Sequence, residues 1–161
     1  MKKQNIAFEL TVFDMLEELP SEAQELMVSA IAARKKAYAP YSNFQVGAAV
    51  LLENGQVVAG NNQENASYPS GLCAERVAVF HAGANFPGVL IKAIAISATS
   101  ENYQVDKPAA PCGNCRQSLS EYEVKQKEPI KLFMMGETGQ VLQCDSIADI
   151  LPLAFDSSFL E

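Results

Sequence analysis

The chain has 161 residues, of which 48% are hydrophobic, and it carries a formal net charge of −7 with a pI near 4.7. This length and apolar content predict a single domain over residues 1–161 with its own core. The acidic balance provides no basic stripe to neutralise phosphates, which argues against nucleic acid or an anionic membrane as a partner and favours a small neutral or cationic substrate.

The first twenty residues, MKKQNIAFELTVFDMLEELP, form an N-terminal extension whose structure the sequence leaves open. The extension could cover the edge of a sheet, lie across another subunit or be disordered. Acidic side chains interrupt its apolar residues, and no apolar run in the chain approaches the length of a membrane span. We therefore expect no membrane partner and a cytoplasmic location.

The next elements are a helix and a hairpin. From Ser21 onward, apolar residues recur at helical spacing, with Ser21 and Gln24 as a predicted capping box and Pro40 as the stop. Asn54-Gly55 then separates two β-branched apolar runs, which is the strongest short hairpin signal in a sequence. Strands are expected at about residues 46–52 and 56–61.

The second half of the chain alternates helices and strands. We predict a helix from residue 73 that Gly83 closes, a fully buried strand over 89–99 and a second short helix over 112–123. A strand from Ile130, a turn at 136–139 and one further strand would complete the chain. This alternation predicts an α/β layered domain in which helices cover a sheet.

Three of the four cysteines lie where helices are expected to begin. Cys73 opens the helix after the hairpin, and PCGNC places Cys112 and Cys115 on one face of a first helical turn, with Pro111 as a start signal. Unsatisfied N–H groups and the helix dipole make a thiol at this position easier to ionise. In a cytoplasmic chain such cysteines are reduced thiols or metal ligands rather than disulfides.

Three thiolates can hold one Zn²⁺ per chain tetrahedrally and leave the fourth position open, which is the catalytic rather than the structural arrangement. Cys144 lies in a late strand without a helix start beside it, so we do not expect it to be a ligand. His81 lies eight residues beyond Cys73, about 12 Å along the helix, and cannot share the ion.

Charged residues beside these cysteines suggest the chemistry. Glu75, on the first turn after Cys73, can approach the ion and move a proton, although an acidic residue in a first turn can also simply complement the helix dipole. Zn²⁺ with three thiolates carries a net charge of minus one. Arg76 and Arg116 each follow a cysteine and could withdraw that charge by bonding to a thiolate, or could be plain surface arginines.

The segments NNQENASYPSGLCAERVAVF, PCGNCRQSL and KKAYAPYSNFQVGAAVL together resemble the cytidine deaminases, specifically their small homotetrameric zinc form, over about residues 30–155. The order Cys-Ala-Glu and then Pro-Cys-x-x-Cys is the zinc deaminase signature described for this family. The resemblance implies a three-layer α/β/α fold with a mixed sheet of about five strands. It also implies hydrolytic deamination of cytidine and deoxycytidine in pyrimidine salvage, with attack at C4 and with Glu75 protonating N3 and then the departing ammonia.

The resemblance also implies roles for substrate-binding residues. Asn62 and Glu64 match the pair that hydrogen-bonds the ribose 3'-hydroxyl. Phe44 matches an aromatic that packs on the base, and the backbone of Ala74 matches the group that serves the base carbonyl. Taken alone, Asn62 and Glu64 would pass as turn residues after the hairpin and Phe44 as a core residue.

Two aromatic residues are implied to act between subunits. ILPLAFDSS resembles a tail that carries a phenylalanine into a neighbouring subunit's pocket, which maps onto Phe155, and Tyr68 is a second candidate. The implied partner is therefore further copies of the chain, in a homotetramer with active sites at subunit interfaces. In the alternative, Phe155 fills the core of its own chain and Tyr68 caps a loop.

Three other functions remain open from the sequence. One is deamination of another aminopyrimidine nucleoside, and a second is deamination of nucleic acid, which should require a basic groove and aromatic stacking platforms. The third is a non-enzymatic protein with a structural zinc site or a redox pair.

Overall fold

Six strands and four α-helices alternate along residues 1–160, which are the residues that the structure, a computed structural model, describes. In chain order they are β1 (Thr11–Phe13), α1 (Ser21–Arg34), β2 (Phe44–Leu52), β3 (Val57–Asn61), α2 (Ala74–Asn85), β4 (Ile91–Ser100), α3 (Gly113–Gln126), β5 (Lys131–Met135), β6 (Val141–Cys144) and α4 (Ile147–Ile150). None of the helices within residues 1–160 has the length and apolar character needed to cross a membrane.

The strands form one mixed sheet with the order β1-β6-β5-β4-β2-β3. β4 and β5 are parallel, with α3 as the helix between them, and the other neighbouring pairs are antiparallel. The predicted α/β class and mixed sheet are confirmed, with six strands rather than about five. The sixth is β1, because the N-terminal extension adds an edge strand in which Thr11 pairs with Gln143.

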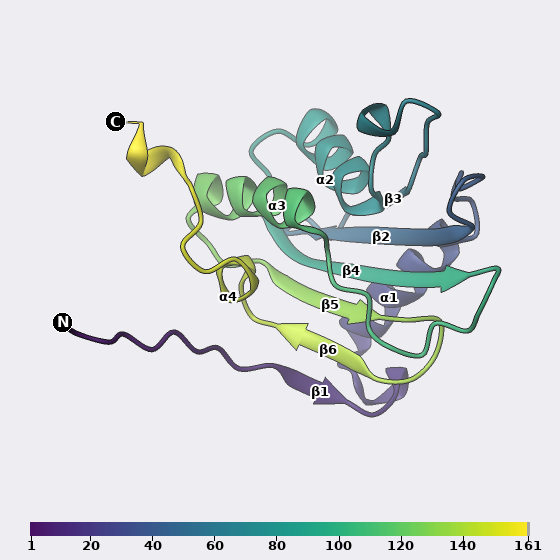
Figure 1. The fold of residues 1–161 in the computed structure, drawn as a ribbon, viewed down its shortest axis with the longest axis horizontal. Coiled ribbons are helices and arrows are strands. Elements are labelled where there is room, and N and C mark those ends of the chain that lie inside the picture. The colour runs from purple at the N-terminus through teal and green to yellow at the C-terminus, as the bar shows by residue number, and fades with distance from the viewer. Residues whose placement is uncertain (161) are drawn as a thin grey trace.

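Helices cover both faces of the sheet, so the predicted three-layer arrangement is also confirmed (Figure 1). α1 packs on one face, and α2, α3 and α4 pack on the other. Residues along β2 alternate between the two cores, since Ala48 and Val50 face α2 and α3 whereas Ala49 and Leu51 face α1. Every one of these β2 residues is buried, which explains why the strand is apolar without interruption.

Close backbone contact fixes α2 against the sheet. A Cβ atom at Gly60 of β3 would lie only 2.5 Å from the Ala78 backbone nitrogen and 2.8 Å from the Ala74 carbonyl oxygen. Only glycine leaves room for this approach. The first turn of α2, which carries the candidate site residues Ala74, Glu75 and Arg76, is therefore held directly on β3.

The predicted boundaries of α1 need correction. Pro20 is the N-cap and Ser21 makes no capping hydrogen bond, so the capping box is wrong. The Gln24 amide instead donates to the carbonyls of Glu17 and Leu19, which belong to the turn before the helix. The helix ends at Arg34, well before Pro40, because the Tyr38 N–H leaves the helical pattern to donate to the carbonyl of Asn62.

The later elements follow the prediction with two differences. Gly83 does not close α2, which continues to Asn85, because Gly83 serves as a packing position where any side chain would meet the Tyr122 ring. The α4 helix was not predicted, although Ser146 and Asp149 form the capping box that begins it. The hairpin at Asn54-Gly55, with Gly55 at φ 81°, and the turn between β5 and β6 are as predicted.

Candidate metal centre and substrate pocket

Three cysteine sulfurs meet at the N-terminal ends of α2 and α3. Cys73 is the N-cap of α2, Cys112 is the N-cap of α3, and Cys115 is buried in the first turn of α3. The Cys73 and Cys112 sulfurs are 4.0 Å apart, the Cys112 and Cys115 sulfurs are 3.6 Å apart, and all three lie within 4.8 Å of one another. We call these three residues the cysteine cluster.

The spacing of the cysteine cluster suits zinc. Tetrahedral Zn–S bonds of about 2.3 Å place the sulfurs roughly 3.8 Å apart, whereas a disulfide would place them about 2.05 Å apart. Of the described residues, only these form a group of three or more possible ligands. Cys144 is packed in the core beneath α3 and His81 is exposed on α2, so neither belongs to the cluster.

The three thiols ionise unequally. Hydrogen bonding from the Cys115 thiol, together with the Arg76 guanidinium, lowers the pKa of Cys73 to about 5. The same contact with Cys73 raises the pKa of Cys115, and burial raises it further. Negative charge therefore gathers first on Cys73, at the positive end of the α2 dipole, where it can attract a cation. A coordinated metal ion deprotonates its thiol ligands.

Glu75 lies buried beside the cysteine cluster, with only 5% of its surface exposed. Burial raises the pKa of its carboxyl group, and the negative charge on Cys73 raises it further. Hydrogen bonding from the backbone N–H of Glu75, and to a smaller extent from the Cys115 thiol, lowers the pKa and partly offsets this shift. A raised pKa makes a carboxyl group a better proton acceptor, which suits a group that must take up and release protons beside a metal site.

The two arginines that follow cysteines make different contacts. Arg76 Nη2 lies 3.9 Å from the Cys73 sulfur and 3.4 Å from the Gly71 carbonyl oxygen. Arg116 donates from Nε to the Pro111 carbonyl and from Nη1 to the Ile150 carbonyl. Arg76 thus touches a thiol, while these Arg116 bonds join the start of α3 to the end of α4.

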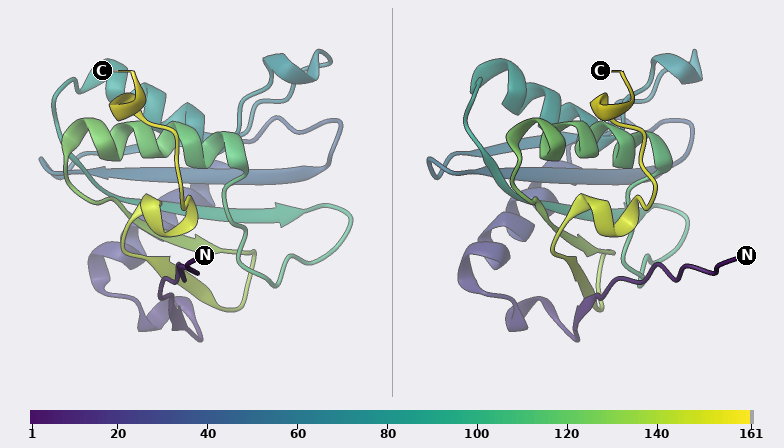
Figure 2. Two further views of the ribbon diagram at one scale, coloured as in Figure 1. Left: turned by 60° about the vertical axis from the view of Figure 1, so that its left-hand side comes forward. Right: turned by 90° about the vertical axis from the view of Figure 1, so that its left-hand side faces the viewer.

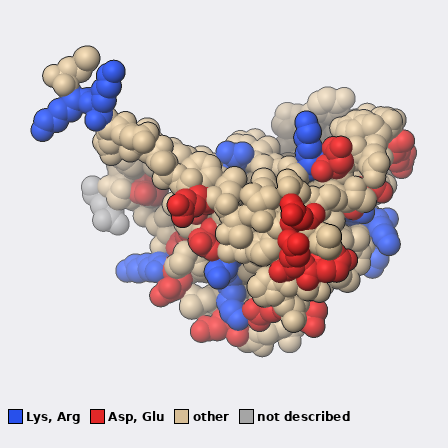
Figure 3. Space-filling model, turned by 90° about the horizontal axis from the view of Figure 1, so that it is seen from below, with Lys and Arg blue, Asp and Glu red and all other residues tan. Residues whose placement is uncertain are grey.

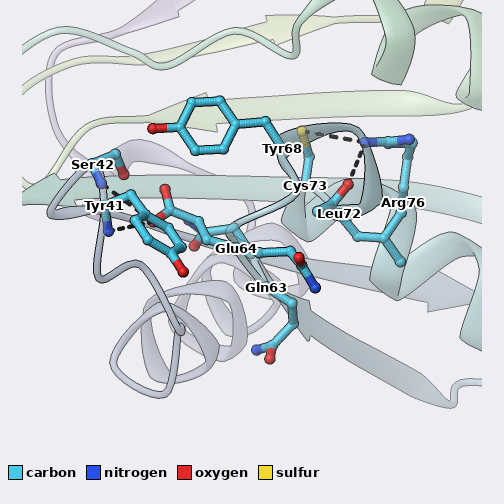
Figure 4. Close-up of a pocket in the computed structure, with 11 residues that line it drawn as sticks. Tyr41, Ser42, Gln63, Glu64, Tyr68, Leu72, Cys73 and Arg76 are labelled. Atoms are coloured by element: carbon cyan, nitrogen blue, oxygen red, sulfur yellow. Dashed lines mark hydrogen bonds between the residues drawn. The ribbon is translucent and has the colours of Figure 1, made fainter.

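A pocket of about 350 Å³ opens beside Cys73. Figure 4 shows Tyr41 and Ser42 at one end of this pocket, Cys73 and Arg76 at the other, and Glu64 between them. The lining comes from the loop after α1, the loop between β3 and α2, and the first turn of α2: Tyr41, Ser42, Asn62, Gln63, Glu64, Asn65, Tyr68, Gly71, Leu72, Cys73 and Arg76.

Backbone hydrogen bonds tie these two loops together. The Tyr38 N–H donates to the Asn62 carbonyl, and the Glu64 N–H donates back to the Tyr38 carbonyl, at 3.0 and 2.9 Å. Gln63 and Leu72 exchange a pair of similar bonds at 2.9 and 3.0 Å. The pocket is therefore built from irregular segments whose backbone groups are paired as in a small sheet.

Glu64 presents an ionised carboxylate in this pocket. Its Oε2 accepts hydrogen bonds from the backbone N–H groups of Tyr41 at 2.8 Å and Ser42 at 3.2 Å. Desolvation acts to raise the pKa of Glu64, but hydrogen bonds from Ser42 and Tyr41 outweigh it and lower the pKa below its ordinary value. Glu64 is thus a fixed acceptor for hydroxyl or amine donors on a ligand.

The Asn62 side chain joins β2 to the pocket loop. Its Oδ1 accepts from the Val46 N–H at 2.8 Å, and its Nδ2 donates to the Phe44 carbonyl at 2.9 Å. The second Nδ2 hydrogen is left for another acceptor. The Phe44 ring is half-buried at the start of β2 and is not part of the pocket lining. Ala74 is the first residue of α2, where backbone N–H groups lack an intrahelical acceptor.

The two aromatic residues expected to act between subunits lie on the surface of the chain. Tyr68 is 74% exposed and packs its ring 6.0 Å from that of Tyr41, beside the pocket. Phe155 is 57% exposed and stacks on Phe159 at 5.4 Å, so it does not fill the core of its own chain. Gln117 of α3 donates to the Phe155 carbonyl and holds the tail near α3.

Tyr41 and Ser42 are pocket residues that the sequence did not reveal. Both hold Glu64 through backbone N–H groups, and such a role leaves no mark on side-chain identity. The segment KKAYAPYSNFQVGAAVL contains both residues and contributes to the family resemblance, but the resemblance assigns no role to either of them.

The layered α/β fold, the three-sulfur donor set and the buried carboxyl beside it form the arrangement expected of a zinc-dependent hydrolase. Comparison with known proteins narrows this class. Residues 20–127 match the family model described as the cytidine and deoxycytidylate deaminase zinc-binding region. The chain belongs to this family. The family binds zinc, and the cysteine cluster of this chain could hold a zinc ion.

Individual relatives agree with the family. The chain is 39% identical to the cytidine deaminase of Halalkalibacterium halodurans over 134 residues, which is 83% of this chain and 94% of that protein. It is 36% identical to the cytidine deaminase of Sporosarcina psychrophila over 140 residues, 86% and 95% of the two chains. The solved structure of cytidine deaminase from Burkholderia pseudomallei superimposes with a TM-score of 0.70 at 44% identity, covering 81% of this chain and 97% of that one.

Proposed function

We propose that this protein hydrolyses cytidine and deoxycytidine to uridine and deoxyuridine, releasing ammonia, as a step of pyrimidine salvage. The observation that carries the proposal is the single pocket that joins Cys73 of the cysteine cluster to the Glu64 carboxylate. One end is suited to hydrolytic chemistry on a base and the other to hydrogen-bonding a sugar. Membership of the deaminase family supports the same reaction.

Cys73, Cys112 and Cys115 are the residues proposed to hold the zinc ion. The ion supplies Lewis-acid activation of the water that replaces the amino group. Arg76, at 3.9 Å from the Cys73 sulfur, withdraws part of the negative charge that three thiolates bring to the site. Arg116 bonds to backbone carbonyls and is assigned to holding the start of α3 in place.

Glu75 is proposed as the proton carrier. Its burial keeps the pKa of the carboxyl group raised, so it can take a proton from the attacking water. It delivers this proton to N3 of the base, then takes the remaining proton of the added hydroxyl group and delivers it to the departing amino group. The overall reaction consumes one water and releases one ammonia, so Glu75 returns to its initial protonation state after each cycle.

Glu64 is proposed to accept a hydrogen bond from the ribose 3'-hydroxyl, with Asn62 offering its remaining N–H to the same sugar. The backbone of Ala74 at the start of α2 is assigned to the base carbonyl, and Phe44 to packing against the base. Sites built around a hydroxyl strongly reject ligands that lack it. The proposed site therefore favours nucleosides over free cytosine.

The test measures deamination by the change in ultraviolet absorbance after purified zinc-loaded protein is mixed with one compound at a time. The compounds are cytidine, deoxycytidine, their monophosphates, free cytosine and a cytosine-containing oligonucleotide. Rapid turnover of the two nucleosides, with slow turnover of the other compounds, is the expected result. Turnover of the oligonucleotide in preference to nucleosides, or zinc binding without any turnover, would contradict the proposal.

We also propose that the protein is a homotetramer whose sites are completed by neighbouring subunits. Phe155 and Tyr68 support this part of the proposal because both rings are exposed in the single chain although both are large and apolar. Tyr68 already borders the pocket, and Phe155 lies on a tail that can reach another copy. Closed symmetric assemblies are the usual outcome of self-association.

Mixed assemblies test the shared site. Chains with Glu75→Ala lack the proton carrier, and chains with Phe155→Ala lack the donated ring. If Phe155 acts on a neighbouring subunit, co-refolded hybrids should recover activity above either parent, because some sites combine an intact Glu75 with a donated Phe155. Hybrids no more active than the parents, or a monomer by light scattering at working concentration, would count against shared sites.

A further inference from the structure

The N-terminal segment of residues 1–10 stands away from the rest of the chain. Beyond β1 it makes no strand or helix, and each of these ten residues is exposed (Figures 1 and 2). The family match begins only at residue 20, so the family does not account for this segment. We call residues 1–10 the arm.

The arm has the pattern of a strand with one apolar face. Ile6, Phe8 and Leu10 alternate with smaller or polar residues, and their side chains remain 51%, 47% and 40% exposed. Alternation with a period of two places these three side chains on one side of an extended chain. The far end carries Lys2 and Lys3, which give the arm a positive tip on an acidic protein. Figure 3 shows this basic tip projecting from a body whose visible face carries many acidic side chains.

A groove of complementary character opens on the face of the sheet that α1 covers. It has a volume of about 510 Å³, and its apolar floor is the edge of the core beneath α1, where Leu26, Leu51 and Phe133 are only 1%, 6% and 4% exposed. We call it the α1 groove. Acidic residues exceed basic ones around it, with Glu22, Glu53, Glu128 and Asp145 against Lys92 and Lys131. Since Lys92 pairs with Glu22, the carboxylates of Glu53 and Glu128 are the ones placed to receive an incoming cation.

The arm leaves its own chain close to this groove without entering it. Thr11 pairs with Gln143 in the sheet, and Asp145, two residues further on, belongs to the groove rim. The antiparallel register of Thr11 with Gln143 directs the arm toward Asp145, but residues 1–10 are all exposed and do not bend over the rim onto the α1 face. Residues 6–13, IAFELTVF, contain none of the residues that favour tight turns (Gly, Pro, Asn, Asp or Ser), so no turn signal bends the arm onto the groove of its own chain. The arm instead continues outward, in line with β1 (Figure 1).

We infer that the arm is an exchange element that docks in the α1 groove of a second copy of this chain. Its apolar side chains enter the groove, and Lys2 and Lys3 approach the partner copy's rim carboxylates. Every copy carries one arm and one groove, so two copies can exchange arms reciprocally and form a closed pair. The groove lies on the opposite side of the sheet from the cysteine cluster, so the inference is independent of the proposed chemistry.

A photocrosslinking experiment tests the arm exchange. The full-length chain is prepared with the photoreactive amino acid p-benzoylphenylalanine in place of Phe8. It is mixed with chains that lack the photoreactive residue and carry a tag that increases their mass. The expected product joins one chain of each size, and its crosslinked peptides contain groove residues from 51–53, 90–93 or 128–133. Crosslinks within one chain, crosslinks to the exposed edge of β1, or no crosslink at all would overturn the inference.

Two controls distinguish specific docking in the groove from nonspecific association of the arm. The same photoreactive residue in place of Ala7, on the opposite side of the arm, should give a several-fold lower yield at the groove. Lys2→Glu with Lys3→Glu should also lower the yield from position 8 several-fold, and Glu53→Lys with Glu128→Lys in the partner copy should restore it. Equal yields from positions 7 and 8, or failure of the charge exchange to restore the yield, would contradict the assigned groove. These changes should leave cytidine turnover per zinc unaltered.

Discussion

The two ends of the pocket are constructed differently. At the proposed metal end, two helix starts fix the positions of the sulfurs; Cys73 lines the pocket, whereas Cys115 and Glu75 are buried outside its lining, with Glu75 only 5% exposed. At the proposed sugar end, two irregular loops carry the pocket residues, among them Glu64 and Tyr68, and the Tyr68 ring is largely in solvent. Rigid elements thus position the reactive groups, while hydrogen bonds between loops position the recognition groups.

This difference shows what a single chain can supply by itself. All the groups of the proposed metal end, the three cysteines and Glu75, lie together in one chain. The sugar end depends on a few side chain to backbone contacts and remains open to solvent. Substitutions at the metal end should therefore abolish chemistry, whereas those at the sugar end should change selectivity and local stability.

Loss of a zinc ligand should have the largest effect. Cys112→Ala or Cys115→Ala removes one of three sulfurs, and two thiolates cannot complete the site, so zinc content and activity should both fall to background. Metal analysis of the purified variants measures the zinc content, and cytidine turnover measures the activity. Cys144→Ala is the matched control, because Cys144 is a buried thiol outside the cluster and its loss should leave one zinc per chain. Full zinc retention in Cys112→Ala would refute the ligand assignment.

At the proposed metal end, Glu75→Gln should lower the rate of the reaction without lowering the zinc content. The amide fills the same space but cannot carry the proton, so kcat should fall by about 10²- to 10⁴-fold while zinc remains bound. Zinc content and kcat are measured on the same preparation. Near-normal turnover in this variant would rule out Glu75 as the proton carrier, and loss of zinc would mean that the carboxylate supports the metal instead.

The metal end was also the part that the sequence predicted best. Each of its features is local: Cys73, Cys112 and Cys115 mark helix starts, and helix starts follow from the nearby Pro111 and the apolar periodicity. The sugar end involves residues far apart in the chain. Asn62 and Glu64 were identified only through a family resemblance, and Tyr41 was missed because its contribution is a backbone N–H.

The fold shows the same division between local and distant signals. The hairpin at Asn54-Gly55 and the buried run of β4 were predictable because turn chemistry and apolar content decide them within a few residues. The role of Gly83 was not predictable from the sequence, because Gly83 contacts Tyr122 on another helix. The pairing of Thr11 with Gln143, which makes β1 the sixth strand, joins the two ends of the chain and has no local signature.

Glu64→Gln should produce the next largest effect and should act on selectivity. A hydrogen bond to a charged group contributes about 1.5–3 kcal/mol, so kcat/KM for cytidine should fall roughly 10- to 100-fold. Free cytosine has no sugar, and its already low kcat/KM should change little. Steady-state kinetics with both compounds give the ratio, and Glu25→Gln on the exposed side of α1 is the matched control. An equal loss for cytidine and cytosine would show that Glu64 acts through the fold and not through the sugar.

Asn62→Ala should give the smallest effect, on stability as well as on binding. The substitution leaves the Val46 N–H and the Phe44 carbonyl without their partner, which should cost about 1–3 kcal/mol of unfolding free energy. For a chain of this size each kcal/mol lowers Tm by roughly 2–4 °C, so calorimetry of the zinc-loaded protein can detect the change. Asn62→Asp keeps the acceptor but loses the donor and should be intermediate. Gln63→Ala, at the exposed neighbouring position, should stay close to the parent protein. An unchanged Tm with a raised KM for cytidine would show that Asn62 serves the sugar alone, so the sugar end would not depend on this link to β2.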